Sequence, residues 1–159
     1  MIWRAAVAIL VLPGIVAFLV PWLIVERLVP GYSIDPLGAI PFGLGLFLLA
    51  WCVWCFFVYG RGTIGPWDPP KQLVVDGPYR FSRNPMYVAV ALILWGWALG
   101  YHSIALAGYA ATVMLAFHLR VVMGEEPWLE KTHGEIWHRY RRRVPRWIGP
   151  PSRSGRRSD

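Results

Sequence analysis

Two adjacent carboxylates, Glu125 and Glu126, are the residues whose types and spacing best suit chemistry in this sequence. They follow His118 and Arg120, which lie near the end of a long apolar run. Beside anionic lipids, paired carboxylates require cations or hydroxyl groups as partners. Those partners are either arginines of the same chain or the ammonium and ribose groups of a ligand, and the residues alone leave both interpretations open.

A second candidate site precedes another apolar run, at Ser82-Arg83-Asn84-Pro85. Asparagine followed by proline is typical of a helix start, with Asn84 as the N-cap and Pro85 at the first helical position. The free N–H groups and the positive dipole end of such a helix, with Arg80 and Arg83 beside it, suit a carboxylate or a phosphate. The alternative is that these arginines extend to lipid headgroups.

The composition indicates which elements position these residues. Apolar residues make up 56% of the 159 residues and charged residues only 16%, whereas a soluble domain has roughly 25% charged residues. This balance excludes a disordered tail, a disulfide-linked secreted module and an ordinary water-soluble enzyme, and it indicates an integral membrane protein. We expect a single domain over 1–150 and a disordered basic tail over 151–159.

Four apolar stretches predict an all-α fold with four transmembrane helices, over residues 5–25, 37–59, 85–99 and 103–123. The last two are separated by three residues and predict a tight hairpin, within which the spacing of Gly96 and Gly100 favours close packing. Pro127 is expected to stop or kink the last span. Beyond it, the apolar spacing predicts an interfacial amphipathic helix, so that a cofactor site can use only residues 60–84, residues 124–148 and the helix ends.

Basic residues are concentrated on one side of this topology. With four spans, fifteen of the sixteen lysines and arginines lie on the side of the two termini, and only Arg27 lies on the other. The positive-inside rule therefore predicts cytoplasmic termini, in a multi-pass protein that we expect in a bacterial inner membrane. The net charge of +7 then favours anionic membrane lipids as partners over nucleic acid. The oligomeric state is not indicated.

Motifs of soluble enzymes are missing from the sequence, which has no phosphate loop, HExxH, GxSxG or dinucleotide-binding turn. Cys52 and Cys55 lie inside the second span without a second ligand pair, so we interpret them as packing thiols and predict no metal site. Some tryptophans lie deep enough in the spans to line a pocket, where aromatic faces stabilise sulfonium or quaternary ammonium groups. These are Trp51, Trp54, Trp95 and Trp97.

Two motifs resemble the isoprenylcysteine carboxyl methyltransferase and phospholipid methyltransferase superfamily. The stretch LVVDGPYRFSRNPMY over 73–87 resembles its "LV..GPY...RHPxY" signature. Glu125, Glu126, Leu129, Gly134, Tyr140 and Val144-Pro145 resemble its "EE..L...G....Y...VP" tail. The resemblance covers half of the chain, and it implies an integral membrane enzyme that uses S-adenosyl-L-methionine without a Rossmann domain.

The resemblance also implies the roles of individual residues. The cofactor is expected to contact the first motif and its surroundings, and its polar end is expected to contact the paired carboxylates. The predicted cofactor-binding residues are Arg83, Asn84, Pro85, Met86, Tyr87, His118, Glu125 and Glu126. Arg120, displaced by about one position from the family's substrate-binding arginine, is expected to orient the substrate. Asn84 stands where the motif has histidine, which removes a titrating group from that position, and Ala89 replaces a frequent glycine.

The implied reaction is methyl transfer from S-adenosylmethionine to a small lipophilic acceptor. That acceptor is the carboxylate of an isoprenylcysteine-like substrate or a lipid amine, and the residues do not choose between them. An NADPH-dependent membrane reductase of the sterol type, which has a similar tail motif, and a non-catalytic membrane subunit are the alternative hypotheses.

Overall fold

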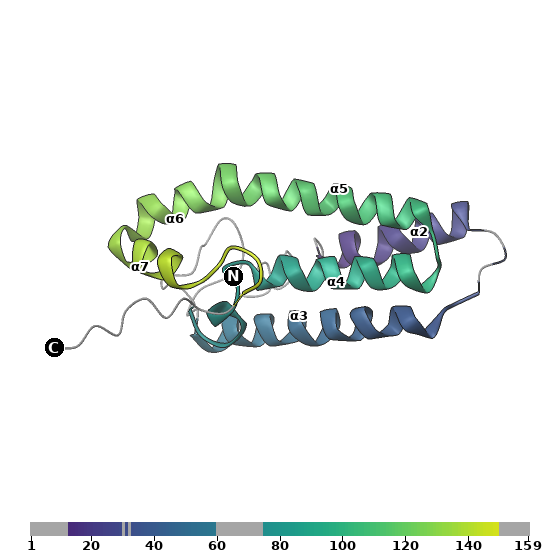
Figure 1. Cartoon of the computed structure of the whole chain (residues 1–159), viewed down its shortest axis with the longest axis horizontal. Helices are drawn as coiled ribbons and strands as arrows, with labels where there is room; N and C mark the ends of the chain where they lie inside the picture. Colours follow the sequence, from purple (N-terminus) through teal and green to yellow (C-terminus); the bar gives the residue numbers. More distant parts are fainter. Residues whose placement is uncertain (1–12, 30, 32, 60–74, 150–159) are drawn as a thin grey trace.

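A computed structural model describes residues 13–29, 31, 33–59 and 75–149, and within these residues the fold is all-helical. A π-helical turn, Ile15–Leu19, continues into α2 (Val20–Leu28). The helices α3 (Ala39–Tyr59), α4 (Pro85–Gly100) and α5 (Ile104–Arg120) form an elongated bundle in which α4 lies between α3 and α5 (Figure 1). The predicted tail over 151–159 and the first part of the predicted 60–84 connection lie outside the described residues.

Local sequence signals set the starts of the long helices. The Asp35 carboxylate accepts a hydrogen bond of 2.8 Å from the Leu37 amide in the turn Pro36–Gly38, which leads into α3. The Ser103 hydroxyl accepts one of 3.4 Å from the Leu106 amide at the start of α5. Each is an N-cap that satisfies an amide lacking a partner within its own helix. The hairpin between α4 and α5 is closed by His102, whose backbone is left-handed and whose ring lies 2.8 Å from Asp35.

The predicted spans agree with the helices to within a few residues. Two helical segments, Pro36–Cys55 and Ile104–His133, are long and apolar enough to cross a membrane, and Pro85–Gly100 is a shorter apolar helix. Of the predicted first span, residues 5–12 lie outside the described residues, and the helix continues to Leu28 rather than ending at Val25. The prediction of an all-helical fold is therefore confirmed, with two long apolar helices where the sequence predicted four spans.

Glycines allow α3 and α4 to approach closely, and this corrects the predicted role of the Gly96–Gly100 pair. A Cβ atom on Gly96 would lie 2.6 Å from Phe42, and one on Gly38 would lie 2.4 Å from the Gly100 amide nitrogen. Gly45 likewise faces the Ala89 carbonyl. Gly96 therefore packs against α3 and Gly100 against the turn Pro36–Gly38 that precedes it, not within the α4–α5 hairpin.

At the end of the last predicted span, the structure shows the kink, which is one of the two outcomes expected at Pro127, and not a helix end. Pro127 does not stop the helix: α5 continues through a π-helical turn, Val121–Glu125, into α6 (Glu126–His133). A π-helical turn accommodates a residue that lacks an amide proton, and the helix changes direction there (Figure 1). Gly134, with a left-handed φ of +48°, then separates α6 from α7 (Glu135–Arg143), so the predicted amphipathic segment is two short helices.

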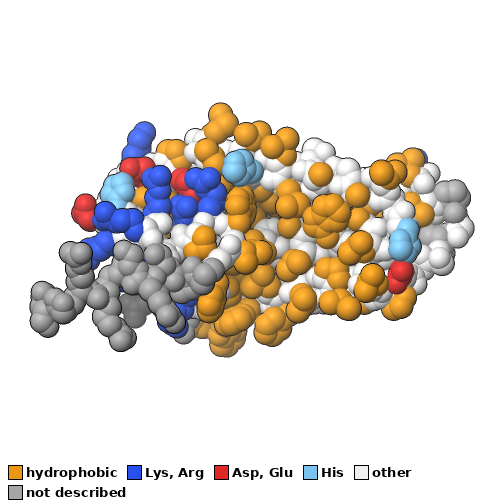
Figure 2. Space-filling view, viewed as in Figure 1, with side chains coloured by type: hydrophobic (Ala, Val, Ile, Leu, Met, Phe, Trp, Pro, Cys, Tyr) orange, Lys and Arg blue, Asp and Glu red, His pale blue; other side chains and the backbone are white. Residues whose placement is uncertain are grey.

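Polar and apolar side chains are segregated along the length of the bundle. On the face seen in Figure 2, basic and most acidic side chains gather at the end formed by α6 and α7, and hydrophobic side chains are spread along the rest of the bundle. Many of these hydrophobic residues are exposed, among them Phe47 on α3 and Leu115 on α5. Such extensive apolar exposure is typical of a surface that contacts lipid.

Candidate active site

Two segments about sixty residues apart in sequence meet at the polar end of the bundle. The Arg83 amide donates to the Pro145 carbonyl at 2.9 Å, and the Gly149 amide donates to the Phe81 carbonyl at 3.3 Å. Asn84 is the residue before α4, as predicted, but its side chain does not cap the helix. Its amide instead donates to the Arg146 carbonyl at 3.1 Å, so Asn84 joins the two segments.

Glu126 is buried in a cluster with two arginines. Arg146 donates two hydrogen bonds of 2.8 Å to this carboxylate, one to each oxygen, and Arg83 donates a third of 2.8 Å to Oε1. The Arg83 guanidinium also lies over the Trp137 ring, 5.4 Å from its centre. Burial lowers the pKa of Arg83, whereas the hydrogen bonds to Glu126 raise that of Arg146. Both glutamate oxygens are thus occupied by cations of the chain.

Glu125 has different partners and remains accessible. Its Oε1 accepts hydrogen bonds from the Tyr87 hydroxyl and from Arg120 Nε, the latter at 2.8 Å. About a third of the Glu125 side chain is exposed. Because both bonds end on Oε1, Oε2 accepts no hydrogen bond from the part of the chain that the structure describes. The predicted carboxylate pair therefore divides into one buried glutamate held by arginines and one with a free oxygen.

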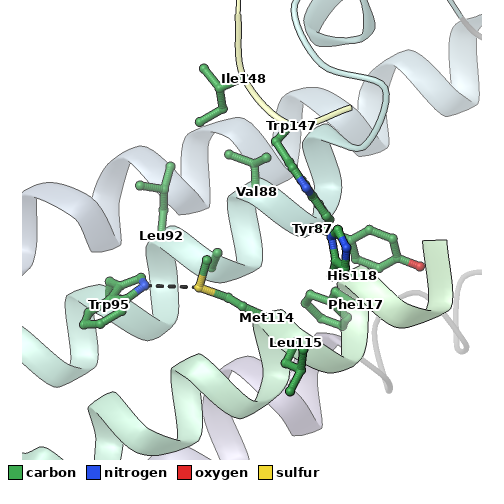
Figure 3. A pocket seen from close by; sticks show the side chains of 11 residues that line it. Tyr87, Val88, Leu92, Trp95, Met114, Leu115, Phe117, His118, Trp147 and Ile148 are labelled. Carbon is green, nitrogen blue, oxygen red and sulfur yellow. Dashed lines mark hydrogen bonds between the residues drawn. The ribbon is translucent and has the colours of Figure 1, made fainter. Parts of the chain in front are cut away.

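A cavity of about 450 Å³ lies between α4 and α5 beside Tyr87 (Figure 3). The Tyr87 ring stacks on Phe117 with 4.4 Å between their centres, and the His118 ring faces Trp147 at 6.0 Å. At the other end Trp95 Nε1 donates to the Met114 sulfur at 3.3 Å. The lining is almost entirely apolar: Tyr87, Val88, Ala91, Leu92, Trp95, Met114, Leu115, Phe117, His118, Trp147 and Ile148.

The structure brings some of the predicted site residues together and separates others. Tyr87 and His118 share the cavity wall, and Tyr87, Arg120 and Glu125 are hydrogen-bonded to one another. Arg83 and Glu126 form the buried cluster behind them, and Pro85 is fully buried. Met86 packs on the opposite side of α4, against the buried thiols of Cys52 and Cys55, which have the packing role predicted for them.

Sequence reasoning missed the residues that follow α7. Arg146 binds Glu126, and Trp147 and Ile148 line the cavity, although none of these three residues was predicted to belong to the site. The only signal for these positions was the Val144-Pro145 pair at the end of the tail motif. Of the four deep tryptophans expected to line a pocket, Trp95 lines this cavity, whereas Trp97 donates a hydrogen bond to the Ala17 carbonyl.

The apolar helical bundle with a polar cluster at one end is typical of the class of helical membrane proteins. The family model for phospholipid methyltransferase matches residues 36–136, and the chain belongs to this family. No curated protein and no solved structure matches the chain.

Membership of the family defines the activity in outline. The protein is an S-adenosylmethionine-dependent methyltransferase, and the family acts on lipids. This confirms the family, the enzyme class and the cofactor that the motifs implied. Family membership therefore favours the methyltransferase over the reductase and the non-catalytic subunit, which were the alternative hypotheses. The match and the two long apolar helices together support an integral membrane protein.

Proposed function

We propose that the enzyme methylates a small lipophilic acceptor held in the cavity between α4 and α5. The acceptor is the carboxylate of an isoprenylcysteine-like molecule or the amine of a lipid. The observation that carries this proposal is the position of Tyr87, whose ring lines the apolar cavity while its hydroxyl donates to Glu125. One side chain thus joins a chamber suited to a lipid chain to a carboxylate suited to a polar ligand.

The chemistry of the residues around Tyr87 fits S-adenosylmethionine. Glu125 Oε2 is available to the ammonium or ribose hydroxyl groups of the cofactor, and the aromatic faces of Tyr87 and Trp147 suit its sulfonium. When bound, the cofactor supplies an electrophilic methyl group. In this proposal Glu125, Tyr87 and His118 contact the cofactor, whereas Asn84, Pro85, Met86 and the Arg83–Glu126 pair hold the start of α4 and of α6 in place.

The chain's own residues then contribute mainly positioning and exclusion of water. The apolar cavity wall keeps water from the acceptor, and the cavity holds it at a fixed orientation. Arg120, next to Glu125, is placed to orient a carboxylate acceptor. An amine acceptor must lose a proton before it can attack, and in this proposal the imidazole of His118, in the cavity wall, is the base.

We further propose that the polar end of the bundle faces the cytoplasm. The support is the distribution of basic residues, fifteen of which lie on that side if the chain crosses the membrane four times. In this orientation the predicted first span, which ends in α2, crosses the bilayer together with α3, α4 and α5, and the exposed Met114 and Leu115 at the cavity wall contact lipid. The acceptor then enters the cavity from the membrane.

Filling the cavity tests the proposed acceptor site. Ala91→Phe adds a ring to the cavity wall, and we expect it to raise the KM for the lipid acceptor about tenfold or more while leaving S-adenosylmethionine affinity within twofold. Ala116→Phe, on an exposed surface of α5 outside the cavity lining, is the matched control. The KM for the acceptor would be measured in vesicles with full-length protein. Equal KM values for the two variants would show that the cavity does not bind the acceptor.

A further inference from the structure

A second concave surface lies at the polar end of the bundle and shares no lining residue with the cavity. This groove, of about 700 Å³, lies between the segment before α4 and the helix α7. We call it the arginine groove. Its lining residues are Val75, Asp76, Arg80, Ile136, Arg139, Tyr140, Arg143 and Val144.

The charge of the arginine groove is strongly positive. Arg139 and Arg143 are four residues apart on α7 and therefore lie on one face of that helix, and Arg80 lines the groove from the turn Gly77–Arg80. Among the described residues that line the groove, Asp76 is the single carboxylate. None of these three arginines forms an ion pair with any residue that the structure describes, whereas Arg83, Arg120, Arg141 and Arg146 each pair with a glutamate.

The floor and rim of the groove indicate what kind of anion it suits. Tyr140 and Val144 are buried, and the Tyr140 hydroxyl donates to the Tyr79 carbonyl at 2.7 Å, which fixes the floor. Val75 and Ile136 on the rim are exposed by 39% and 56%. Guanidinium groups bind phosphate oxygens in pairs, and an apolar rim beside them suits a phosphate that carries acyl chains.

We propose that the arginine groove binds the phosphodiester headgroup of an anionic membrane lipid, at a site separate from the methyl-transfer site. Arg80, Arg139 and Arg143 bind the phosphate, and Val75 and Ile136 contact the first part of the acyl chains. The proposal rests on the membrane orientation given above, because only there does the groove lie at headgroup depth. It does not depend on the identity of the methyl acceptor.

Lipid binding to the full-length protein in detergent tests this site. Native mass spectrometry would measure binding of phosphatidylglycerol and phosphatidylcholine in the absence of S-adenosylmethionine. We expect phosphatidylglycerol to bind at least tenfold more tightly. Arg139→Gln and Arg143→Gln should each weaken its binding about tenfold, because each removes charge-assisted hydrogen bonds.

Two control variants separate this site from general electrostatics and from the cavity. Arg142→Gln removes the same charge from the same helix but does not line the groove, and it should change phosphatidylglycerol affinity by less than twofold. Ala91→Phe should leave that affinity unchanged even if it abolishes acceptor turnover. Retained S-adenosylmethionine binding shows that each arginine variant is folded. Arg80 lines the groove but does not belong to α7, and Arg80→Gln should also weaken phosphatidylglycerol binding.

Three results would overturn the proposal. The first is a loss of phosphatidylglycerol affinity in Arg142→Gln as large as that in Arg139→Gln and Arg143→Gln. It would show that the lipid is attracted by the overall positive charge and is not bound in the groove. The second is equal binding of the two lipids. The third is calorimetric binding of inorganic phosphate that depends on Arg139 and Arg143 while phosphatidylglycerol does not bind, which would assign the groove to a soluble anion.

Discussion

Replacing Glu126 with glutamine should destabilise the protein far more than the same change at Glu125. The Glu126 and Arg83 side chains are only 10% and 8% exposed, and Glu126 accepts three charge-assisted hydrogen bonds of 2.8 Å. Removing one partner of a buried pair costs about 3–5 kcal/mol. Glutamine retains one acceptor oxygen and Arg146 is 31% exposed, so we take the lower end, about 3 kcal/mol.

This loss can be measured by thermal unfolding of the full-length protein in detergent. For a chain of this size, each kcal/mol corresponds to about 2–4 °C in Tm, so Glu126→Gln should lower Tm by about 6–12 °C. Its affinity for S-adenosylmethionine, measured by calorimetry well below the lowered Tm, should stay within about threefold of the wild type, because arginines donate to both Glu126 oxygens and our proposal assigns cofactor contact to Glu125.

Glu125→Gln should give the opposite pattern. Its partner Arg120 is 57% exposed, and exposed ion pairs contribute about 0–1 kcal/mol, so Tm should fall by no more than about 4 °C. The affinity for S-adenosylmethionine should fall about tenfold, because a charged acceptor for the cofactor is lost. Glu130→Gln is the control on the same helix, since Glu130 is exposed and forms only longer contacts with His138 and Arg141; it should change neither quantity.

The reasoning would be refuted if Glu126→Gln left Tm unchanged and weakened cofactor binding as much as Glu125→Gln. That result would mean that the carboxylates act as a pair toward the ligand and that the arginine cluster is rearranged when the cofactor binds. Unchanged cofactor affinity in Glu125→Gln would instead remove Glu125 from the site.

Three further predictions concern the frame of the molecule. Gly45→Ala should lower stability by about 1–3 kcal/mol, measured as Tm, because its Cβ would lie 2.7 Å from the Ala89 carbonyl oxygen and the helices would have to separate; an unchanged Tm would contradict the close packing of α3 and α4. Tyr140→Phe should cost about 1–3 kcal/mol, since the buried Tyr79 carbonyl loses its 2.7 Å donor, and a loss below about 0.5 kcal/mol would contradict this. The hydrogen bond from the Leu37 amide and the contact with His102 lower the pKa of Asp35 below its ordinary value of 3.8, so the stability that it contributes is present above about pH 4 and is lost as the pH falls through the lowered pKa. The Tm advantage of the wild type over Asp35→Asn should therefore shrink below pH 4. An advantage that grew below pH 4 would contradict the lowered pKa of Asp35.

The helices were predictable because their signals are local. The run over 37–59 corresponds to α3, and the run over 85–99 corresponds to α4, which begins at Pro85 as predicted. Apolar length and a proline or a capping residue at each start determine these bounds, and they need no knowledge of the rest of the fold. Pro127 predicted a stop or a kink, and the structure shows the kink, but the π-helical turn that precedes it is not visible in the sequence.

The partners within the site were not predictable for a physical reason. Glu125 and Glu126 are neighbours, so the sequence suggests one shared site, but adjacent residues on a helix point about 100° apart. One carboxylate therefore meets Arg83 and Arg146, and the other meets Tyr87 and Arg120. Which arginine meets which glutamate depends on the contact between the segments 81–84 and 145–149, which only the folded chain brings together.

The cavity was equally beyond the sequence, because its wall is assembled from α4, α5 and the segment after α7. The cavity-lining residues of α4 have helical spacing, which in the sequence is typical of ordinary packing or of contact with lipid. They are Val88, Ala91, Leu92 and Trp95. Trp147 and Ile148, from the segment after α7, complete the lining of the cavity near Tyr87 (Figure 3).

Transfer of a labelled methyl group tests the central claim most directly. Full-length protein in vesicles of mixed membrane lipids would be incubated with methyl-labelled S-adenosylmethionine, and the label would be measured in the organic-soluble lipids. The account predicts label in a lipid, reduced about tenfold by Tyr87→Phe, which keeps the cavity wall but loses the hydroxyl that donates to Glu125. Lipid labelling that is undiminished in Tyr87→Phe, or label confined to water-soluble products, would contradict it.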